Sequence, residues 1–222
     1  MEEKVDGANS AVSFGPAGEL RLQSRGHYLT GGRGEVQFDL FKKWAHAHAD
    51  VLRRKLRDRY VMFGDWLFAK HTLYYDDLPH LFIEFDLLDT VGMEFLDTPR
   101  RKELGKGLPV VSAPVLYEGR LQSMQELVGL LGQSHYIREG NVEALRKECS
   151  ARGVEFERVL ASTDVTLLME GLYVKVEEGG VVRERAKFVR DDFQSRFDDD
   201  VRWTPIVRNR LRAGVDIFAP AP

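Results

Sequence analysis

Residues 171–189 read GLYVKVEEGGVVRERAKFV, and the fold class follows from this run outward. Residues 171–177 and residues 181–189 are rich in branched and aromatic side chains, which favour extended strands. Between them stands Glu178-Gly179-Gly180, and a glycine pair has the backbone freedom that a tight hairpin turn requires. The run therefore predicts a β-hairpin, and with it an antiparallel sheet late in the chain.

A second hairpin is predicted early in the chain. Residues 11–14 and 20–23 are short extended runs, and Gly15-Pro16-Ala17-Gly18 between them has the composition of a turn. Further strands are predicted at residues 60–68, 81–88 and 110–117, and helices at residues 38–59, 98–104, 123–131 and 142–151. Strands at both ends and helices in the middle predict an α+β domain built on antiparallel sheets.

The composition is that of a soluble globular protein. Of 222 residues, 43% are hydrophobic and 30% charged, and the formal charge of −3 excludes an indiscriminate positive coat for nucleic acids. No run of about 18 apolar residues occurs, so no membrane partner is expected. The single cysteine, Cys149, and the absence of a leader pattern at Met1 indicate a cytoplasmic location. We expect one large domain over residues 1–190 and a short tail, residues 191–222, packed on it.

Two short motifs near the start have candidate chemistry. In Lys4-Val5-Asp6-Gly7, a lysine before an Asp-Gly turn is held at a strand end, where its amine can face a cleft. A lysine attacks only as the neutral amine, so desolvation or nearby cations must help it lose its proton. In Ser24-Arg25-Gly26, the glycine lets a planar guanidinium approach a phosphate closely. Taken alone, each motif is more often a solvated turn or loop.

Two motifs place carboxylates in or after apolar runs: Phe63-Gly64-Asp65-Trp66 and Glu84-Phe85-Asp86-Leu87. Desolvating a carboxylate costs free energy unless it binds a metal, a hydroxyl or a cation. Phe85 either offers a flat face to a purine or is a simple core residue.

The late hairpin adds a fifth and a sixth motif. Met169-Glu170-Gly171 stands before its first strand, and Arg185-Ala186-Lys187-Phe188-Val189-Arg190 lies in and after its second. Period-two alternation puts Arg185 and Lys187 on the same face, where two cations can clamp a triphosphate. The alternative is the charged solvent face of an ordinary hairpin.

In this order, the six motifs resemble the series shared by the covalent nucleotidyltransferases, namely the DNA ligases, RNA ligases and mRNA capping guanylyltransferases. The resemblance runs from Glu3 to Arg190. The amino-acid sequences of residues 22–28, 63–71 and 169–177 look most like those of bacterial ATP-dependent RNA ligases of the phage RNA ligase 2 type. This resemblance implies an antiparallel-sheet nucleotidyltransferase domain, of the ATP-grasp-like ligase catalytic kind, without a C-terminal OB domain.

The resemblance implies how four residues meet the nucleotide. Lys4 is expected to attack the α-phosphate of ATP and become adenylylated with release of pyrophosphate. Glu3 is expected near the adenine amino group, and Phe85 is expected to stack on adenine. Arg25 is expected to contact phosphates.

Four more positions match the metal and phosphate motifs. Glu170 is expected to help hold Mg²⁺ or Mn²⁺, and Asp65, where the family normally has glutamate, to contact the ribose or the metal shell. Lys187 is expected to contact the α-phosphate and favour pyrophosphate departure. Arg185 stands where the family often has lysine, and its planar fork differs from a compact ammonium.

The expected substrate is RNA with 5′-phosphate and 3′-hydroxyl ends, such as a nicked duplex, and protein partners are left open. The family usually has a segment before the lysine motif, whereas three residues precede Lys4, so we expect a mis-set start or a truncation. Alternatives are a minimal DNA ligase, a guanylyltransferase, or a nucleotide- or RNA-binding relic without turnover.

The remaining polar clusters are interpreted as background. His46 and His48 diverge by about 200° on a helix, which makes a poor metal pair. Cys149 is expected to be inert, and Lys70-His71 is expected in a loop or at a phosphate. Asp198-Asp199-Asp200 is interpreted as a solvated turn. The basic tail is interpreted as a nucleic-acid contact or a plain surface, and it comprises Arg202, Arg208, Arg210 and Arg212.

Overall fold

The structure, a computed structural model, describes residues 1–195 and 205–219, and a single sheet lies at its centre. The strand order in the described residues is β1-β9-β10-β7-β6-β5-β2-β3-β4, with β8 beside β6. The strands are β1 (Glu2–Lys4), β2 (Ala8–Phe14), β3 (Leu20–Ser24), β4 (His27–Tyr28), β5 (Tyr60–Trp66), β6 (Phe82–Asp89), β7 (Glu94–Leu96), β8 (Val111–Ser112), β9 (Gly171–Glu178) and β10 (Val181–Val189). The helices are η1 (Arg33–Phe38, a 3₁₀-helix), α1 (Asp39–Ala47), α2 (Ala49–Leu56), α3 (Thr98–Gly105), α4 (Met124–Val128), α5 (Asn141–Arg152) and α6 (Phe156–Ala161).

The described strand pairs are antiparallel except β6–β8, which is parallel, so the predicted α+β class with an antiparallel sheet is confirmed. Both predicted hairpins form, β2 with β3 and β9 with β10. The turn of the second hairpin has φ of 64° at Gly179 and 84° at Gly180, the left-handed pair that a two-residue hairpin loop needs.

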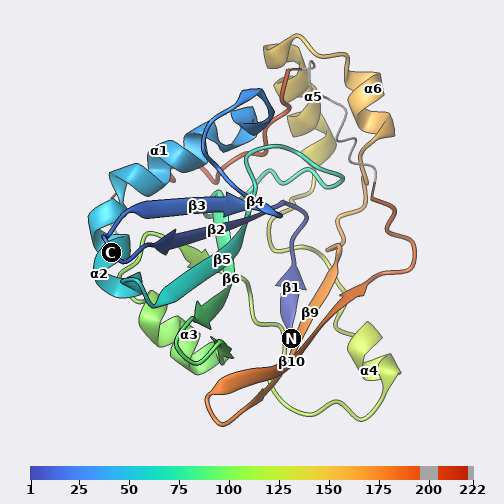
Figure 1. Ribbon diagram of the computed structural model, residues 1–222. Helices are drawn as coiled ribbons and strands as arrows, with labels where there is room; N and C mark the ends of the chain where they lie inside the picture. Colours follow the sequence, from blue (N-terminus) through green and yellow to red (C-terminus); the bar gives the residue numbers. More distant parts are fainter. Residues whose placement is uncertain (196–204, 220–222) are drawn as a thin grey trace.

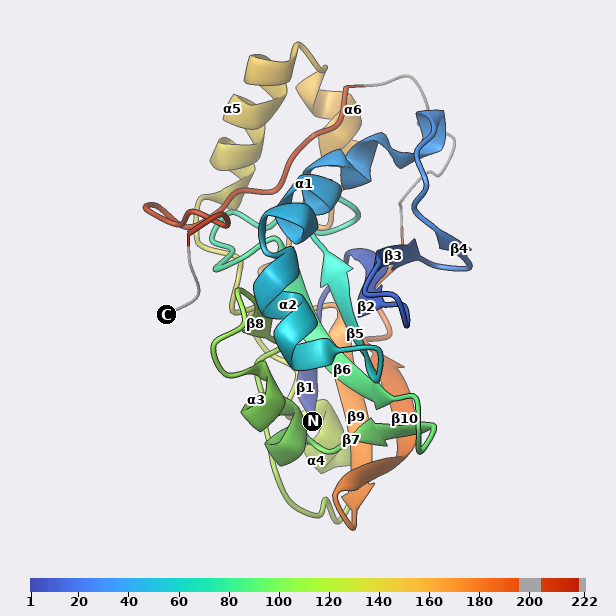
Figure 2. The ribbon, with the colours of Figure 1, turned by 60° about the vertical axis from the view of Figure 1, so that its left-hand side comes forward.

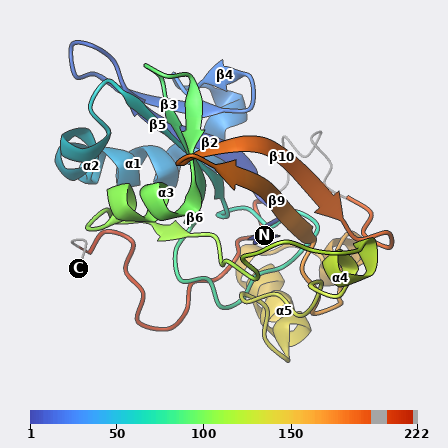
Figure 3. The same cartoon turned by 90° about the horizontal axis from the view of Figure 1, so that it is seen from below.

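The sheet has two parts, which are joined through β7, the strand that pairs with both β10 and β6. β1 pairs with β9, with Lys4 opposite Gly171, so the first residues lie beside the late hairpin (Figure 1). Seen from below, β9 and β10 sweep away from the part that contains β2, β5 and β6 (Figure 3). Residues from both parts can therefore face one shared space.

The prediction of one continuous helix over residues 38–59 is wrong. It is two helices, α1 and α2, and they are separated at His48. The His48 ring is buried and its Nε2 lies 3.0 Å from the carbonyl oxygen of Ile217, so a distant contact accompanies the break. The apolar face still packs as expected, because Phe41 and Trp44 are fully buried against Phe82 of β6. Figure 2 shows α1 and α2 over this face of the sheet.

Two other predicted elements are shorter than expected. The strand predicted over residues 110–117 contains only β8, because Ala113 and the residues after it bond elsewhere. The backbone N–H of Ala113 donates to Glu84, Pro114 accepts from Glu3, and Leu116 donates to Met1. The helix predicted over residues 123–131 is α4, whose first turn is capped by the Ser123 hydroxyl.

The remaining strong patterns form close to their predicted bounds, as β5, β6, α3 and α5. The short elements β7 and α6 were not predicted; each has few residues to establish a period. None of the helices in the described ranges is long and apolar enough to cross a membrane. Asp198-Asp199-Asp200 and Arg202 lie outside the described residues.

Candidate active site

A cavity of about 630 Å³ opens between the two parts of the sheet. Its walls come from β1, β2, β3, β4, β5, β6, β9 and β10, from η1 and from the turns beside them. Of the predicted site residues, those that line it are Glu3, Lys4, Arg25, Asp65, Phe85, Glu170 and Lys187. Arg185 is not among the lining residues. Six separate motifs thus bring side chains to one space.

Lys4 projects from the last position of β1, with its Nζ 2.5 Å from Oε1 of Glu170. The side chain of Lys4 is 18% exposed, so the amine is reachable yet largely removed from bulk water. Gly171 permits this geometry, because a Cβ there would lie 2.1 Å from the carbonyl oxygen of Phe188. The Glu-Gly dipeptide therefore lets β9 approach β10 closely while Glu170 reaches the lysine.

The Asp-Gly turn after Lys4 is held from a neighbouring loop. Oδ2 of Asp6 accepts hydrogen bonds from the backbone N–H groups of Thr72 and Leu73, at 2.7 and 2.8 Å. The backbone N–H of Asp6 donates to the hydroxyl of Tyr75 at 2.7 Å. A Cβ at Gly7 would lie 2.4 Å from Cδ2 of Leu67, so close packing requires glycine there. Lys-x-Asp-Gly is thus a fixed turn and not a solvated one.

Two carboxyl groups share the cavity wall near the lysine. Burial raises the pKa of Asp65 to about 7, although the charges of Lys4 and Lys187 oppose this rise. Burial likewise raises the pKa of Glu170, against the attraction of Lys4. Both shifts arise mainly from burial, and a divalent cation beside the two carboxylates would oppose them.

The aromatic wall of the cavity is formed by Phe85 and Tyr173. Their ring centroids are 5.5 Å apart in an edge-to-face arrangement. Phe85 is half-buried, and its carbonyl oxygen accepts a hydrogen bond from Nζ of Lys175. This wall offers an apolar face that a planar base could cover.

Arg25 and Lys187 are exposed cations at the cavity, and we call them the cavity cations. Neither makes an ion pair with a carboxylate of residues 1–195 or 205–219. Arg185, two residues before Lys187, differs: its Nη1 lies 2.7 Å from Oδ2 of Asp86 and its guanidinium lies over the Phe95 ring. The alternation on β10 correctly gave a shared face, but the two cations meet different partners.

Glu3 lies in the wall with its carboxylate already bonded. One oxygen accepts from the Ser134 hydroxyl at 2.6 Å, and the other accepts from the backbone N–H of His135 at 3.1 Å and lies 2.7 Å from that ring. The structure therefore shows Glu3 anchoring residues 134–135 to β1.

With this geometry in place, comparison with known proteins assigns the chain. Residues 1–189 match the RNA ligase family. The chain belongs to the RNA ligase family. A search of the curated proteins finds no match.

One similar solved structure is Naegleria gruberi RNA ligase with PPi. The likeness has a TM-score of 0.45 at 19% identity, and it covers 60% of this chain and 41% of that one. The chain thus spans less than half the length of that RNA ligase, and the roles of individual residues depend on the geometry described above.

This RNA ligase family member has a second charged group, which we call the buried ionic cluster because the side chains of all its members except Arg185 are buried. Its members are Glu2, Glu84, Asp86, Arg101, Lys175 and Arg185. Arg101 is fully buried and binds both Glu2 and Glu84. Lys175 lies 2.9 Å from Glu2 and 3.1 Å from Asp86. Three carboxylates and three cations balance, and the cluster ties β1, β6, β9 and β10 to α3.

Sequence reasoning missed several residues at this cavity. Asn9, Gln37 and Tyr173 line it and were not predicted as site residues. His71 was left open between a loop and a phosphate contact, and it is a lining residue in the loop after β5. The Asn9 signal was available, because it directly follows the Lys-x-Asp-Gly turn.

Some of the residues interpreted as background from the sequence have structural positions outside the cavity. Lys70 is buried and its Nζ donates to carbonyl oxygens of His71 and Ser162, so it does not line the cavity. His46 lies in α1, whereas His48 lies at the break after it, which corrects the helical placement of His48. In the described ranges no group of three or more His, Cys, Asp or Glu is arranged to hold a metal. Cys149 is buried, and burial raises the pKa of its thiol.

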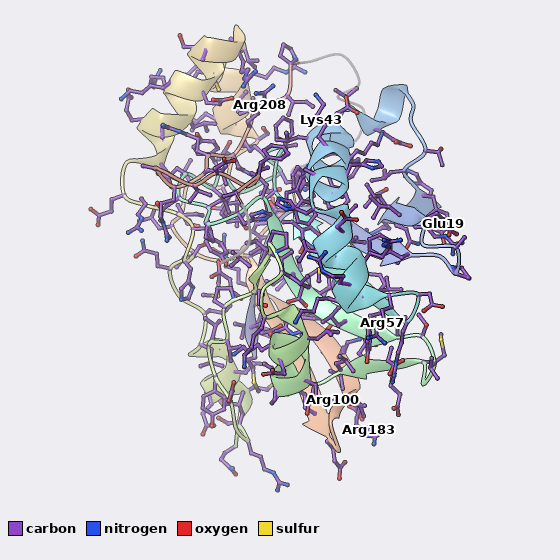
Figure 4. The ribbon with its side chains drawn as sticks, turned by 90° about the vertical axis from the view of Figure 1, so that its left-hand side faces the viewer. Glu19, Lys43, Arg57, Arg100, Arg183 and Arg208 are labelled. Atoms are coloured by element: carbon purple, nitrogen blue, oxygen red, sulfur yellow. The ribbon has the colours of Figure 1, made fainter. Side chains whose placement is uncertain are left out.

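The basic tail is partly used within the fold. Arg212 lies 2.8 Å from Asp77, and Arg208 lies over the Phe68 ring. Figure 4 shows Arg208 at the end of the molecule near α5, far from Arg100 and Arg183. These contacts favour a structural interpretation for Arg208 and Arg212.

Proposed function

We propose that this chain is an ATP-dependent RNA ligase, which takes AMP onto Lys4 and uses it to join a 5′-phosphate to a 3′-hydroxyl. The observation that carries the proposal is the cavity itself. It combines a largely shielded lysine, two desolvated carboxylates, an aromatic wall and two cations without carboxylate partners in the described residues. Phosphoryl transfer needs mainly positioning and charge neutralisation, and these groups supply both.

In the first step, Nζ of Lys4 attacks the α-phosphorus of ATP. A phosphorus–nitrogen bond forms, the bond from the α-phosphorus to the bridging oxygen breaks, and pyrophosphate leaves with that electron pair. The proton on Nζ must be lost first, because an ammonium paired with Glu170 is not nucleophilic. Positive charge beside Lys4, from Lys187, Arg25 and a bound divalent ion, would favour loss of that proton.

We assign the remaining roles from position. Phe85 stacks on the adenine, with Tyr173 bracing its edge. Lys187 contacts the α-phosphate and Arg25 the departing phosphates, which places positive charge where negative charge develops. Arg185 supports this strand by binding Asp86. The contact of Glu3 with the adenine amino group stays a prediction.

Asp65 and Glu170 are the residues that would hold Mg²⁺ or Mn²⁺. The raised pKa of each carboxyl fits a group that a cation would stabilise, and Mg²⁺ commonly takes few carboxylates together with water and phosphate oxygens. When bound, the ion supplies positive charge that stabilises the phosphates and favours the neutral form of the nearby amine.

Two further transfers complete ligation. The 5′-phosphate of RNA attacks the phosphorus of lysyl-AMP, which frees the amine of Lys4 and leaves AMP joined to the RNA end by a pyrophosphate bond. The 3′-hydroxyl of the other strand then attacks the 5′-phosphate, the phosphodiester forms and AMP leaves. We propose residues 1–190 as the nucleotidyltransferase domain and residues 191–222 as a tail packed on it.

A joining assay tests this function. A nicked RNA duplex with a labelled 5′-phosphate is incubated with Mg²⁺ or Mn²⁺ and either ATP or GTP, beside the same nick in DNA. We expect longer labelled RNA with ATP, and none with Lys4→Ala. Lys106→Ala, which removes an exposed lysine paired with Glu103, is the matched control and is expected to join normally. Joining by Lys4→Ala, preference for GTP, or joining of DNA alone would contradict the proposal.

A further inference from the structure

Residues 205–219, which we call the C-terminal strap, lie beyond the segment that matches the RNA ligase family. The strap runs along the molecule as the red trace between α5 and α1 in Figure 2. At one end Val207 packs against the apolar cluster that contains Tyr74 and Cys149. At the other end Ile217 enters the main core and its carbonyl oxygen meets the His48 ring. The strap therefore belongs to the fold of the cavity-bearing domain.

Between these ends the strap is bonded to the loop that follows β5, residues 67–78. The backbone N–H of Lys70 donates to Val207, that of Asn209 to Phe68, and that of Arg210 to Tyr75. Two further backbone hydrogen bonds join Leu78 to the strap: its N–H donates to Arg210, and its carbonyl oxygen accepts from Arg212. A segment outside the family match thus fixes the path of a loop inside it.

Asn209 makes the side-chain contacts at the centre of this junction. It is buried, with 6% of its surface exposed. Its Oδ1 accepts from the backbone N–H of Tyr75 at 3.0 Å, and its Nδ2 donates to the carbonyl oxygens of Leu67 and Ala69, at 2.9 and 3.3 Å. The side-chain amide of Asn209 therefore bridges two separate stretches of the loop, because it bonds backbone groups of Leu67 and Ala69 on one side and of Tyr75 on the other.

The same loop is what holds the Lys4 motif. Its Thr72 and Leu73 amides bind the carboxylate of Asp6, and its Tyr75 hydroxyl accepts from the Asp6 backbone N–H. Tyr75 is fully buried and burial raises the pKa of its hydroxyl well above 10, so it stays a neutral partner. Tyr75 therefore links the two sites: its backbone N–H donates to Asn209, and its hydroxyl at the other end accepts from the turn that follows Lys4.

We propose that Asn209 is a positioning residue for adenylylation: it holds loop 67–78 in the shape that seats Asp6 and so aims Lys4 into the cavity. The inference rests on the proposed function for its catalytic consequence, whereas the coupling of strap, loop and turn is a property of the fold. Asn209 does not line the cavity, so it acts through Tyr75 and Asp6 and not on ATP itself.

The test compares two full-length variants of the strap. Asn209→Ala removes the central amide, and Ile217→Ala removes a core side chain at the strap's far end and serves as the matched control. Each is confirmed as folded by circular dichroism at the assay temperature. We expect Asn209→Ala to lower the rate of lysyl-AMP formation at saturating ATP by about tenfold or more, because small misplacement of a reacting group is costly. The KM for ATP should stay within about twofold, because Arg25, Phe85 and Lys187 are untouched.

Ile217→Ala is expected to lower the melting temperature and to keep the rate within about twofold of wild type at temperatures where it is folded. If Asn209→Ala forms lysyl-AMP as fast as wild type, or if both variants slow in parallel, the positioning role is overturned. Tyr75→Phe gives a second variant, with the same defect expected and no further loss in the double variant, since both act through one chain of contacts. Additive losses would contradict that chain.

Hydrogen exchange separates this inference from the ligase function. In Asn209→Ala, the amides of Asp6, Thr72 and Leu73 are expected to exchange faster than in Ile217→Ala, whether or not the protein is adenylylated. Absence of lysyl-AMP in the wild type would overturn the proposed function, while unequal exchange would still support the coupling. Equal exchange in the two variants would overturn the coupling even in an active ligase.

Discussion

The cavity and the buried ionic cluster are built from the same strands and the same kinds of residue, yet their charged side chains have different partners. On β10, Lys187 faces the cavity, and Arg185, two residues earlier, binds Asp86. On β1, Lys4 faces the cavity, and Glu2 binds Arg101 and Lys175. In the cluster the charges neutralise one another, whereas at the cavity the positive charges of Arg25 and Lys187 have no described carboxylate partner.

The difference teaches how to separate structural charge from functional charge. A buried pair that is complete needs no ligand, and breaking it leaves an uncompensated ion in a low-dielectric interior. A cation left facing a cavity costs little to the fold and gains most when an anionic ligand arrives. Variants in the two regions should therefore fail differently, the cluster in stability and the cavity in chemistry.

The largest effect on the fold is expected from Arg101→Met. It leaves Glu2 and Glu84 buried without their shared guanidinium, so the free energy of unfolding should fall by about 3–5 kcal/mol, measured by urea denaturation. Arg100→Met is the neighbouring control on α3, an exposed residue whose guanidinium reaches only the Gly180 carbonyl in the described structure. Equal losses in the two variants would erase the contrast between buried and exposed arginine.

Lys187→Ala is expected to fail in the opposite way. Loss of one preorganised cation at the reacting phosphate should lower the rate of lysyl-AMP formation by about 100-fold or more. Its unfolding free energy should change by no more than about 0.5 kcal/mol, because the side chain is exposed. Single-turnover kinetics and urea denaturation measure the two quantities. If Lys187→Ala lost stability but formed lysyl-AMP at the wild-type rate, Lys187 would have a structural role like that of the buried ionic cluster.

Asp65→Asn tests the cost of a desolvated carboxylate through pH. Because burial raises the folded-state pKa of Asp65 to about 7, the folded protein holds this proton where the unfolded chain has lost it. Stability from this group is therefore present below about pH 4 and is lost as pH rises through about 7. Without metal, the variant should be more stable than wild type by at least about 1 kcal/mol at pH 8 and by little at pH 4. If the stability difference between Asp65→Asn and wild type instead grew as the pH fell, the pKa of Asp65 would be lowered in the folded protein and not raised.

The smallest effect is expected from Arg183→Ala. Arg183 lies on β10 at the register irregularity between Val182 and Glu184, and it is exposed and pairs only with exposed Glu94 among described residues. Figure 4 shows it at the far end from the strap. Stability should change by less than about 0.5 kcal/mol and lysyl-AMP formation should not change. A clear loss of either would show that charge on β10 matters without regard to its partner.

Local pattern was enough for much of the fold. The branched residues around Gly179 and Gly180 predicted the late hairpin, and its alternation put Arg185 and Lys187 on one face. The positions of Lys4, Asp65, Phe85 and Glu170 in one cavity also agree with the motif order, although their roles stay predictions. What these predictions share is that each depends on neighbours in sequence or on a motif with a fixed spacing.

The rest depended on contacts between distant segments. Asp86 of β6 pairs with Arg185 and leaves Lys187 to the cavity, and no local pattern distinguishes the two cations. The helix break at His48 coincides with its contact to Ile217, 169 residues away. The strand expected after residue 112 is absent, because those amides bind β6 and the first residue of the chain instead. The domain division at residue 190 remains a prediction.

The most direct measurement is covalent labelling. The protein is incubated with α-labelled ATP and Mg²⁺ or Mn²⁺, separated under denaturing conditions, and its labelled peptide is identified by mass spectrometry. AMP is predicted on Lys4, with no label in Lys4→Ala and normal label in Lys106→Ala. Label on another residue, or ATP binding without any label in the wild type, would contradict a nucleophilic role for Lys4.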